Sequence, residues 1–383
     1  MRQFLGRPKT NLSGGIVGLA NVGKSTFFQA ITQTSLGIAA NYPFATIDPE
    51  TAKAEIPSPR LEELCRLFKP ESRVPAAFQV VDIAGLVRGA SQGQGLGNAF
   101  LSHIRAVDGL FQMVRCFEDP AIVHVEQSVD PIRDLGIIYD ELVLKDMEYV
   151  ASAIQACEKG LKNPTGLVER KKLLETARRA AEILDLGRRV DSKQDWTTVE
   201  IEHLRTLSLL TTKPSVVVAN LNEEEWCFGD YSPVVEEVSK WVSHHSPGDE
   251  VVPLSVEFEY RIANLGPEAA QKELAEAGAT TNVGTAVLAL RSALGLQSFF
   301  TAGAGECREW TIRQGSTARQ AAGAIHSDLE KTFISANIVS FEDLVAADGD
   351  FQQVKKAGKL HRQGKEYAMV DGDVAEFKAG AKK

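Results

Sequence analysis

The sequence predicts an α/β protein built on a mostly parallel β-sheet with helices on both faces. Two observations point to this fold class. Apolar segments of strand length at residues 78–82, 109–114, 215–219 and 251–254 alternate with stretches of helical character, which is typical of parallel strands joined by crossover helices. A glycine-rich loop at residues 18–25 joins a short apolar run to another helix-forming stretch. We therefore expect the functional site at the carboxyl ends of the strands, where open α/β sheets bind ligands.

The loop at residues 18–25 reads Gly-Leu-Ala-Asn-Val-Gly-Lys-Ser, a complete G-x-x-x-x-G-K-S phosphate-binding motif. In such a loop, backbone N–H groups surround the phosphates, and Gly18 and Gly23 are expected to let the backbone approach closely. Lys24 is expected to neutralise the β and γ oxygens during catalysis, and Ser25 to offer its hydroxyl to Mg²⁺. The motif predicts a nucleoside triphosphate site whose loop contacts are Asn21, Val22, Gly23, Lys24, Ser25 and Thr26.

A second strand ends in an acidic residue, Asp82, and continues as Ile-Ala-Gly. Asp82 is expected to hold the Mg²⁺ shell, and the backbone N–H of Gly85 to sense the γ-phosphate. Thr46 lies where a switch threonine would contact Mg²⁺ and the γ-phosphate, although its two neighbouring prolines also suit a simple turn. The many glycines within residues 85–97 favour a loop that moves with nucleotide state.

Three segments, residues 82–90, 93–98 and 100–105, resemble the Obg-related NTPases. Within that group, residues 41–49 and the Asn-Leu-Asn-Glu sequence at 220–223 resemble the YchF/Obg-like ATPase branch. The resemblance covers essentially the whole chain. It implies a cytosolic ATPase that associates with ribosomes and carries a helical insertion and a C-terminal TGS domain. The ribosome, or ribosomal RNA, is implied by the resemblance alone, because composition and spacing do not indicate it.

The purine-reading segment departs from the guanine pattern. A GTPase would carry Asn-Lys-x-Asp, in which the Asp accepts two hydrogen bonds from guanine and the Lys covers the base, but this chain has Leu221 and Glu223 at those positions. Losing such a charge-assisted pair costs about 1.5 to 3 kcal/mol, which removes a preference of about tenfold or more. The residues expected at the base are Asn220, Leu221, Glu223 and Ser255. We expect ATP as the ligand, with a GTPase or a purine-unselective NTPase as the alternative.

The group that positions the attacking water is not evident. Ras-like enzymes carry a Gln directly after D-x-x-G, where this chain has Leu86. An isobutyl group cannot hold a water, so the intrinsic rate is expected to be slow, on the order of 10⁻⁴ to 10⁻² s⁻¹. Polar candidates are His103, Gln92, Gln94 and Gln112. His103 lies in an apolar helical start, so a packed or exposed histidine is a simpler interpretation than a catalytic one.

Asn21 in the loop suggests a further cofactor, a K⁺ ion between its side chain, the phosphates and the switch loop. Such an ion would supply the positive charge that an arginine finger otherwise brings; simple loop hydrogen bonding is the alternative. The sequence as a whole predicts a slowly ATP-hydrolysing molecular switch that uses Mg²⁺. A ribosome-binding adaptor with incidental hydrolysis is the alternative from another class.

The chain has room for two or three domains. Helical spacing on both sides of a turn at residues 163–166 predicts a helical hairpin, which would serve as a partner lever or as a simple solvated insert. The residue pattern of the C-terminal segment resembles that of a β-grasp TGS module. The expected division is an NTPase domain at 1–129 and 213–296, a helical hairpin at 130–212, and a TGS-like domain at 297–383.

Charge and cysteine content limit the classes of partner that the sequence predicts. The net charge of −9 gives no general argument for nucleic acid, and no specific DNA binding is expected. The odd number of cysteines without C-x-x-C spacing fits reduced thiols in the cytoplasm and no zinc site. No apolar span suits a membrane. The candidate RNA-contacting cluster on the hairpin, for which solvated charge is the alternative, comprises Arg170, Lys171, Lys172, Arg178, Arg179, Arg188 and Arg189.

Overall fold

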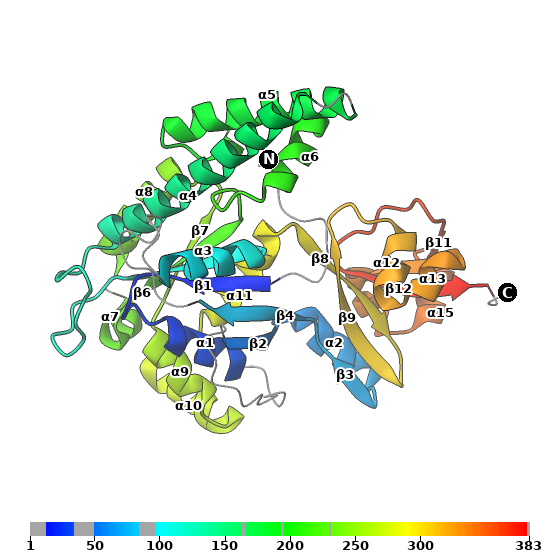
Figure 1. Ribbon diagram of the computed structural model, residues 1–383. Coiled ribbons are helices and arrows are strands. Elements are labelled where there is room, and N and C mark those ends of the chain that lie inside the picture. The colour runs from blue at the N-terminus through cyan, green and yellow to red at the C-terminus, as the bar shows by residue number, and fades with distance from the viewer. Residues whose placement is uncertain are drawn as a thin grey trace. The chain divides into compact units, whose positions relative to one another are not determined.

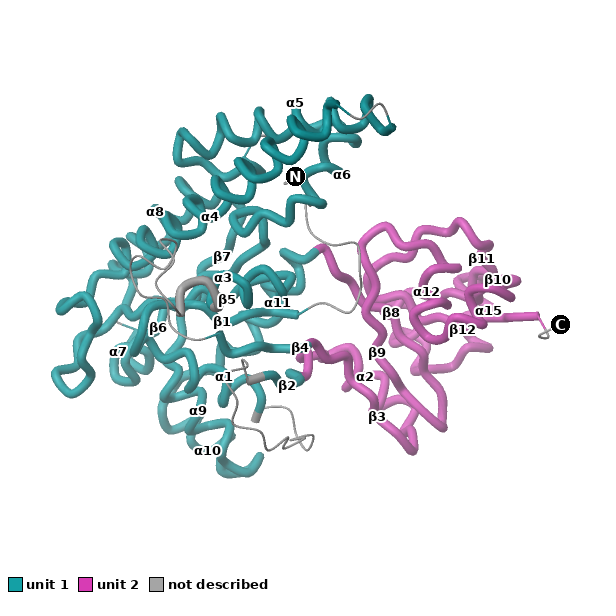
Figure 2. The backbone as a smooth tube through the Cα atoms, viewed as in Figure 1, with its two compact units in different colours: residues 1–8, 12–54, 79–294 teal, residues 9–11, 55–78, 295–383 magenta. Residues whose placement is uncertain are grey.

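The computed structural model divides the chain into two compact units (Figure 2). It describes residues 13–33, 50–83, 96–162, 165–192, 195–229 and 231–380. The first unit comprises residues 1–8, 12–54 and 79–294, and the second comprises residues 9–11, 55–78 and 295–383. No helix in these described ranges is long and apolar enough to cross a membrane.

The first unit is built on a sheet whose strand order is β2-β4-β1-β5-β6-β7. β1 pairs in parallel with β4 and β5, and β6 pairs in parallel with β5 and β7. The mostly parallel sheet predicted from the sequence is therefore confirmed. The strands are β1 (Ser13–Val17), β2 (Glu50–Glu55), β4 (Ala77–Asp82), β5 (Gly109–Arg115), β6 (Ser215–Asn220) and β7 (Glu250–Leu254).

Burial and register explain where this sheet carries its polar residues. Every residue of β6 is buried, as expected for a central parallel strand covered on both faces. Ile16 lies opposite Asp82 in the β1–β4 pair, and Asn220 lies opposite Leu254 in the β6–β7 pair. Parallel pairing therefore brings Asp82 and Asn220 to the same edge of the sheet as the loop that follows β1.

Helices cover both faces of the sheet (Figure 1). α1 packs against α9 and α11, whereas α4 packs against α8 and β5. Outside the helical insertion, the helices of this unit are α1 (Lys24–Gln33), α3 (Leu96–Ala106), α7 (Glu223–Phe228), α8 (Ser232–His245), α9 (Val256–Ala263), α10 (Pro267–Ala277) and α11 (Val283–Ala293).

The insertion between β5 and β6 contains the predicted helical hairpin and a third helix. α4 (Pro131–Gly160) and α5 (Leu167–Asp185) run side by side (Figure 1). The short 3-10 helix η2 (Val190–Ser192) leads to α6 (Thr198–Leu207), which packs against both. The sequence analysis expected two helices, and α6 was missed although Thr197 and Glu200 form a capping box at its start.

Two buried polar clusters join the insertion to the sheet. The Asp146 carboxylate on α4 accepts hydrogen bonds from the backbone N–H groups of Leu210 and Thr211, at 2.7 and 2.8 Å. Arg189 donates to Asp191 over 3.0 Å and to Asp249, next to β7, over 2.9 Å. All three side chains of the Arg189 cluster are at most 4% exposed. Because buried charges need partners, these clusters fix the base of the insertion.

The second unit contains a mixed sheet with the strand order β11-β10-β12-β8-β9-β3. β8 pairs antiparallel with β9 and parallel with β12, while β10 pairs antiparallel with β12 and β11. The elements are α2 (Pro59–Phe68), β3 (Ser72–Val74), β8 (Leu296–Ala302), β9 (Glu306–Arg313), α12 (Ala318–Ile325), α13 (Ser327–Lys331), β10 (Phe333–Ser340), α14 (Phe341–Ala346), α15 (Phe351–Lys356), β11 (His361–Gln363) and β12 (Asp373–Ala379).

One predicted domain boundary differs from the structure. The sequence analysis assigned residues 55–78 to the NTPase domain, but they belong to the second unit. β3 pairs in parallel with β9, and Leu61 and Leu64 of α2 share a core with Phe300 and Cys307. The assignment was wrong because this packing joins segments far apart in the chain. The TGS identity of the unit stays a prediction.

The buried carboxylate of Glu259 predicts a pH dependence of folding. This α9 side chain is 1% exposed and accepts hydrogen bonds from the N–H groups of Asn282 and Val283. Burial raises its pKa from 4.5 to about 7, against the effect of those bonds. Its folded pKa lies above its unfolded pKa, so its stabilising contribution is complete below pH 4.5 and is lost as the pH rises through 7.

We expect the unfolding free energy to fall by roughly 3 kcal/mol between pH 4.5 and 8 through this residue. Glu259→Gln should remove that component, because an amide does not titrate. Urea unfolding measured at several pH values tests this. An unchanged pH dependence in the variant would contradict the assignment.

Candidate functional site

The phosphate loop, residues 18–23, lies between β1 and the first turn of α1. Its conformation depends on two residues with positive φ, Asn21 at 61° and Gly23 at 101°. The N–H of Phe27 donates to the carbonyl of Gly23 over 2.9 Å, which begins the helix directly after the loop. The sequence thus produces the strand–loop–helix unit that the motif predicts, with an N-terminal helix end at the loop.

The two glycines of the motif are required by the protein itself. A Cβ on Gly18 would lie 2.6 Å from the backbone carbonyl oxygen of Met113 on β5, and one on Gly23 would lie 2.7 Å from Nδ2 of Asn220. The sequence analysis attributed both glycines to close approach of the phosphates. The structure gives them a packing reason as well, because neighbouring strands and the purine-side loop occupy the space of a side chain.

Lys24 lies in a buried position at the start of α1. Its side chain is 8% exposed, and Nζ donates to the carbonyl oxygen of Leu19 over 2.6 Å. Burial lowers its pKa from 10.5 to about 8, while the negative charge of Asp82 acts in the opposite direction. A desolvated ammonium held by a neutral carbonyl is well suited to bind an anion, as predicted for the triphosphate.

Ser25 and Asp82 meet beside this lysine. The Ser25 hydroxyl donates to Oδ2 of Asp82 over 2.9 Å, although the residues come from different elements. A hydroxyl next to a carboxylate provides the oxygen ligands that Mg²⁺ prefers. Two of the three predicted protein ligands therefore fit a magnesium site, and the third, Thr46, lies outside the described residues. Thr26, the next residue of α1, is half-buried.

Asn220 connects the phosphate loop to the first residue of α9. Its Nδ2 donates to the carbonyl oxygen of Val22 over 3.0 Å, and its Oδ1 accepts from the N–H of Val256 over 3.1 Å. The side chain is 2% exposed. Sequence reasoning assigned Asn220 to the base and missed this role. One Nδ2 hydrogen is committed to the loop, and contact with the base stays a prediction.

The neighbours of Asn220 have structural duties too. Leu221 is buried in a core with Trp226 and Phe258, so its side chain does not cover a base as a lysine stem would. Its N–H donates to the carbonyl oxygen of Leu254 over 2.9 Å, so this donor is occupied within the protein, and a base contact by Leu221 stays a prediction. Ser255 is fully buried and caps α9 by accepting from the N–H of Phe258 over 3.4 Å.

Glu223 begins α7 and is engaged by an arginine. Its carboxylate forms an ion pair with Arg261 on α9, and the same guanidinium pairs with Glu273 on α10. The guanidinium carbon lies 5.4 Å from the ring centroid of Phe258. The acidic residue of the purine-reading segment is thus bound to other protein groups. Sequence spacing gave no signal for Arg261.

Asn21 contacts a loop that follows β5. Its Nδ2 donates to the carbonyl oxygen of Val123 over 3.0 Å. Arg115, 1% exposed, organises the same loop by donating to the carbonyls of Phe117, Asp119 and Ile122. A cation at Asn21 would use the amide oxygen, which this bond does not occupy. The loop hydrogen bond is the alternative that the sequence analysis considered, and the K⁺ site stays a prediction.

No described contact joins the candidates for water positioning to Lys24, Ser25 or Asp82. His103 is half-buried on α3, and its Nδ1 has no hydrogen-bond partner among the described residues. Gln112, in the middle of β5, donates to the hydroxyl of Ser215 at the start of β6 over 3.0 Å. The predictions that fall outside the described residues are those for Thr46, Gly85, Leu86, Gln92 and Gln94.

The basic cluster predicted on the hairpin is not a free basic surface. Arg178 pairs with Glu158, Arg179 pairs with Asp195 and Glu200, and Arg189 is buried with its acidic partners. Arg170 donates to the carbonyls of Gly160 and Thr165. Lys171, Lys172 and Arg188 are exposed. Four of the arginines therefore have partners within the fold, and contact of this cluster with RNA stays a prediction.

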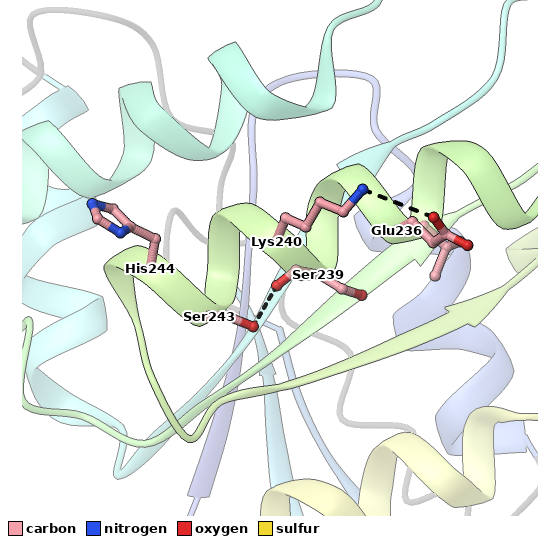
Figure 3. A pocket seen from close by; sticks show the side chains of 6 residues that line it. Glu236, Ser239, Lys240, Ser243 and His244 are labelled. Carbon is pink, nitrogen blue, oxygen red and sulfur yellow. Dashed lines mark hydrogen bonds and ion pairs between the residues drawn. The ribbon is translucent and has the colours of Figure 1, made fainter.

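A surface pocket lies on α8 and contains none of the predicted site residues (Figure 3). All of its lining residues come from this one helix, so it is an open surface feature. Lys240 there pairs with Glu236 over 3.9 Å. The lining residues are Val235, Glu236, Ser239, Lys240, Ser243 and His244.

Known proteins match this chain along nearly its whole length. A model described as 50S ribosome-binding GTPase matches residues 13–147, and the YchF-GTPase C-terminal model, described as a protein of unknown function, matches residues 296–380. Obg-like ATPase 1 of Saccharomyces cerevisiae is 48% identical over 99% of this chain and 97% of its own length. Obg-like ATPase 1 of Bos taurus is 44% identical over 98% and 94%.

A solved structure agrees with these relatives. The Schizosaccharomyces pombe YchF GTPase matches with a TM-score of 0.87 and 43% identity, covering 99% of this chain and 100% of that one. The likeness extends through both units and includes the phosphate loop described above. The chain therefore belongs to the YchF/Obg-like ATPase family, whose members carry a P-loop nucleotide-binding domain.

Proposed function

We propose that this chain binds ATP in preference to GTP and hydrolyses it slowly as a molecular switch of translation. The observation that carries the proposal is the cradle, in which a buried Lys24 lies beside the Ser25–Asp82 pair. A nucleotide-binding switch of the P-loop class is what the family supports. The choice of adenine rests on Asn-Leu-Asn-Glu at residues 220–223, which lacks both the lysine and the aspartate of a guanine reader.

Each residue of the phosphate site has its own proposed role. Lys24 would bind the β and γ oxygens, and Ser25 and Asp82 would hold Mg²⁺, which would neutralise charge that develops on the phosphates. Thr46 and Gly85 are proposed to sense the γ-phosphate. A K⁺ ion at Asn21 would add further positive charge. His103 is half-buried, and this position does not favour it over the other candidates for positioning the attacking water.

The ribosome is the proposed partner in the cytoplasm. Support comes from the model that matches residues 13–147, whose description names 50S ribosome binding. A ribosome-binding adaptor with incidental hydrolysis is the competing model. Co-sedimentation with ribosomes in the presence of ATP, ADP or no nucleotide distinguishes them, because a switch must bind differently in these states.

Nucleotide choice is tested by calorimetric titration of the purified chain with MgATP and MgGTP. We expect ATP to bind more tightly than GTP, because the lost guanine clamp removes a GTP preference of about tenfold or more. Competition of the two nucleotides for one site is the control for shared binding. Tighter binding of GTP than of ATP would overturn the proposal.

A further inference from the structure

We propose that Arg261 is a specificity-determining positioning residue of the purine site, which acts against GTP by holding the carboxylate of Glu223. This inference rests on the proposed function and deepens it. Glu223 stands at the position of the guanine-clamping acid, and Arg261 forms an ion pair with it from α9. Arg261 thus binds a carboxylate that would otherwise be available to accept hydrogen bonds from the base.

The guanidinium is held from three sides. Glu223 on α7 and Glu273 on α10 each accept from a different terminal nitrogen, Nη2 and Nη1 respectively. Phe258, which is fully buried, presents its ring 5.4 Å from the guanidinium carbon. A planar fork with two acidic partners and an aromatic neighbour is a fixed group rather than a mobile surface side chain. Its position therefore sets where the Glu223 carboxylate lies.

The effect on base choice follows from donors and acceptors. Guanine offers two adjacent N–H donors on its Watson–Crick edge, which need a carboxylate able to accept both. Glu223 already accepts from Arg261, so guanine would have to displace or share a charged donor. Adenine does not offer that pair of donors and makes no such demand. Arg261 therefore disfavours GTP without having to touch either base.

The test compares the ratio of the Kd values for MgGTP and MgATP in matched variants. In Arg261→Gln the carboxylate is released, and we expect the ratio to move towards GTP by about threefold to fivefold, the range of a partly exposed ion pair. Arg261→Lys keeps a positive charge for Glu223 and should retain most of the wild-type ratio. Glu273→Gln breaks the outer pair but keeps the Arg261–Glu223 pair, so it should change the ratio less than Arg261→Gln does.

The double variant Arg261→Gln with Glu223→Gln identifies the agent of the shift. Without a carboxylate to release, its ratio should return to that of the wild type. A merely structural role for Arg261 would lower the affinity for both nucleotides and leave the ratio unchanged in every variant. An unchanged ratio in folded Arg261→Gln, or a shift that persists in the double variant, overturns this inference. A wild type that prefers GTP instead overturns the proposed function.

Discussion

Lys24→Ala is expected to weaken MgATP binding by about a hundredfold or more, because it would remove the charge-assisted hydrogen bonds proposed to the β and γ oxygens, at about 1.5 kcal/mol or more each. The ammonium is buried beside Asp82 with its pKa lowered to about 8, so the site contains a cation that lacks full hydration. A bound anion would replace the favourable interactions with water that the ammonium loses on burial. Calorimetric titration of the variant and the wild type measures the loss.

The control for this variant is Lys240→Ala. Lys240 is an exposed lysine on α8 whose partner is Glu236, one helical turn away (Figure 3). Its removal deletes the same charge from the same unit, and ATP affinity should not change. Thermal unfolding of both variants separates lost binding from lost folding, because Lys24 also donates to the carbonyl of Leu19. Undiminished ATP binding by folded Lys24→Ala would refute the cradle assignment.

Arg189→Met is expected to destabilise the first unit by about 3 to 5 kcal/mol, the usual effect of removing one side of a buried ion cluster. Asp191 and Asp249 would keep their buried positions and lose the guanidinium that both contact. Burial already raises the pKa of each carboxyl group, and Arg189 opposes that rise. Without the arginine the carboxyls should take up protons more readily, so the defect should be smaller at pH 5 than at pH 8.

Arg178→Met provides the matched comparison. Arg178 lies on the same insertion, but its side chain is 58% exposed and pairs with Glu158 at the surface. Its loss should change the unfolding free energy by less than about 1 kcal/mol. Urea unfolding followed by circular dichroism compares the two variants at both pH values. Equal stability of the two variants would mean that the Arg189 cluster does not secure the insertion.

The parts of the site that the sequence predicts correctly are those in which local chemistry determines local geometry. The phosphate loop is such a part, because the positive φ of Gly23 and the helix that starts at Lys24 follow from neighbouring residues. The strand carrying Asp82 is another, since an apolar strand with an acidic end is visible in the chain. Ser25 then meets Asp82 because parallel pairing places their segments at one edge.

The parts that the sequence could not predict depend on long-range contacts. Asn220 was recognised as part of the purine reader, but its bonds to Val22 and Val256 join the end of β6 to the phosphate loop and to the start of α9. Arg261 belongs to no motif, and its relation to Glu223 exists only after α7 and α9 have packed. Surface and buried arginines also look alike in a sequence, which is why Arg189 was grouped with exposed charges.

Residues 55–78 leave the first unit and contribute to the second, which links the two units covalently close to Asp82. β4 starts at Ala77, at the end of a segment that belongs to the second unit, and finishes at Asp82 within the first. A displacement of the second unit by a bound macromolecule would therefore reach the carboxylate of Asp82, a proposed Mg²⁺ ligand, along the few residues of β4. The covalent path from residue 294 back to the same strand is far longer.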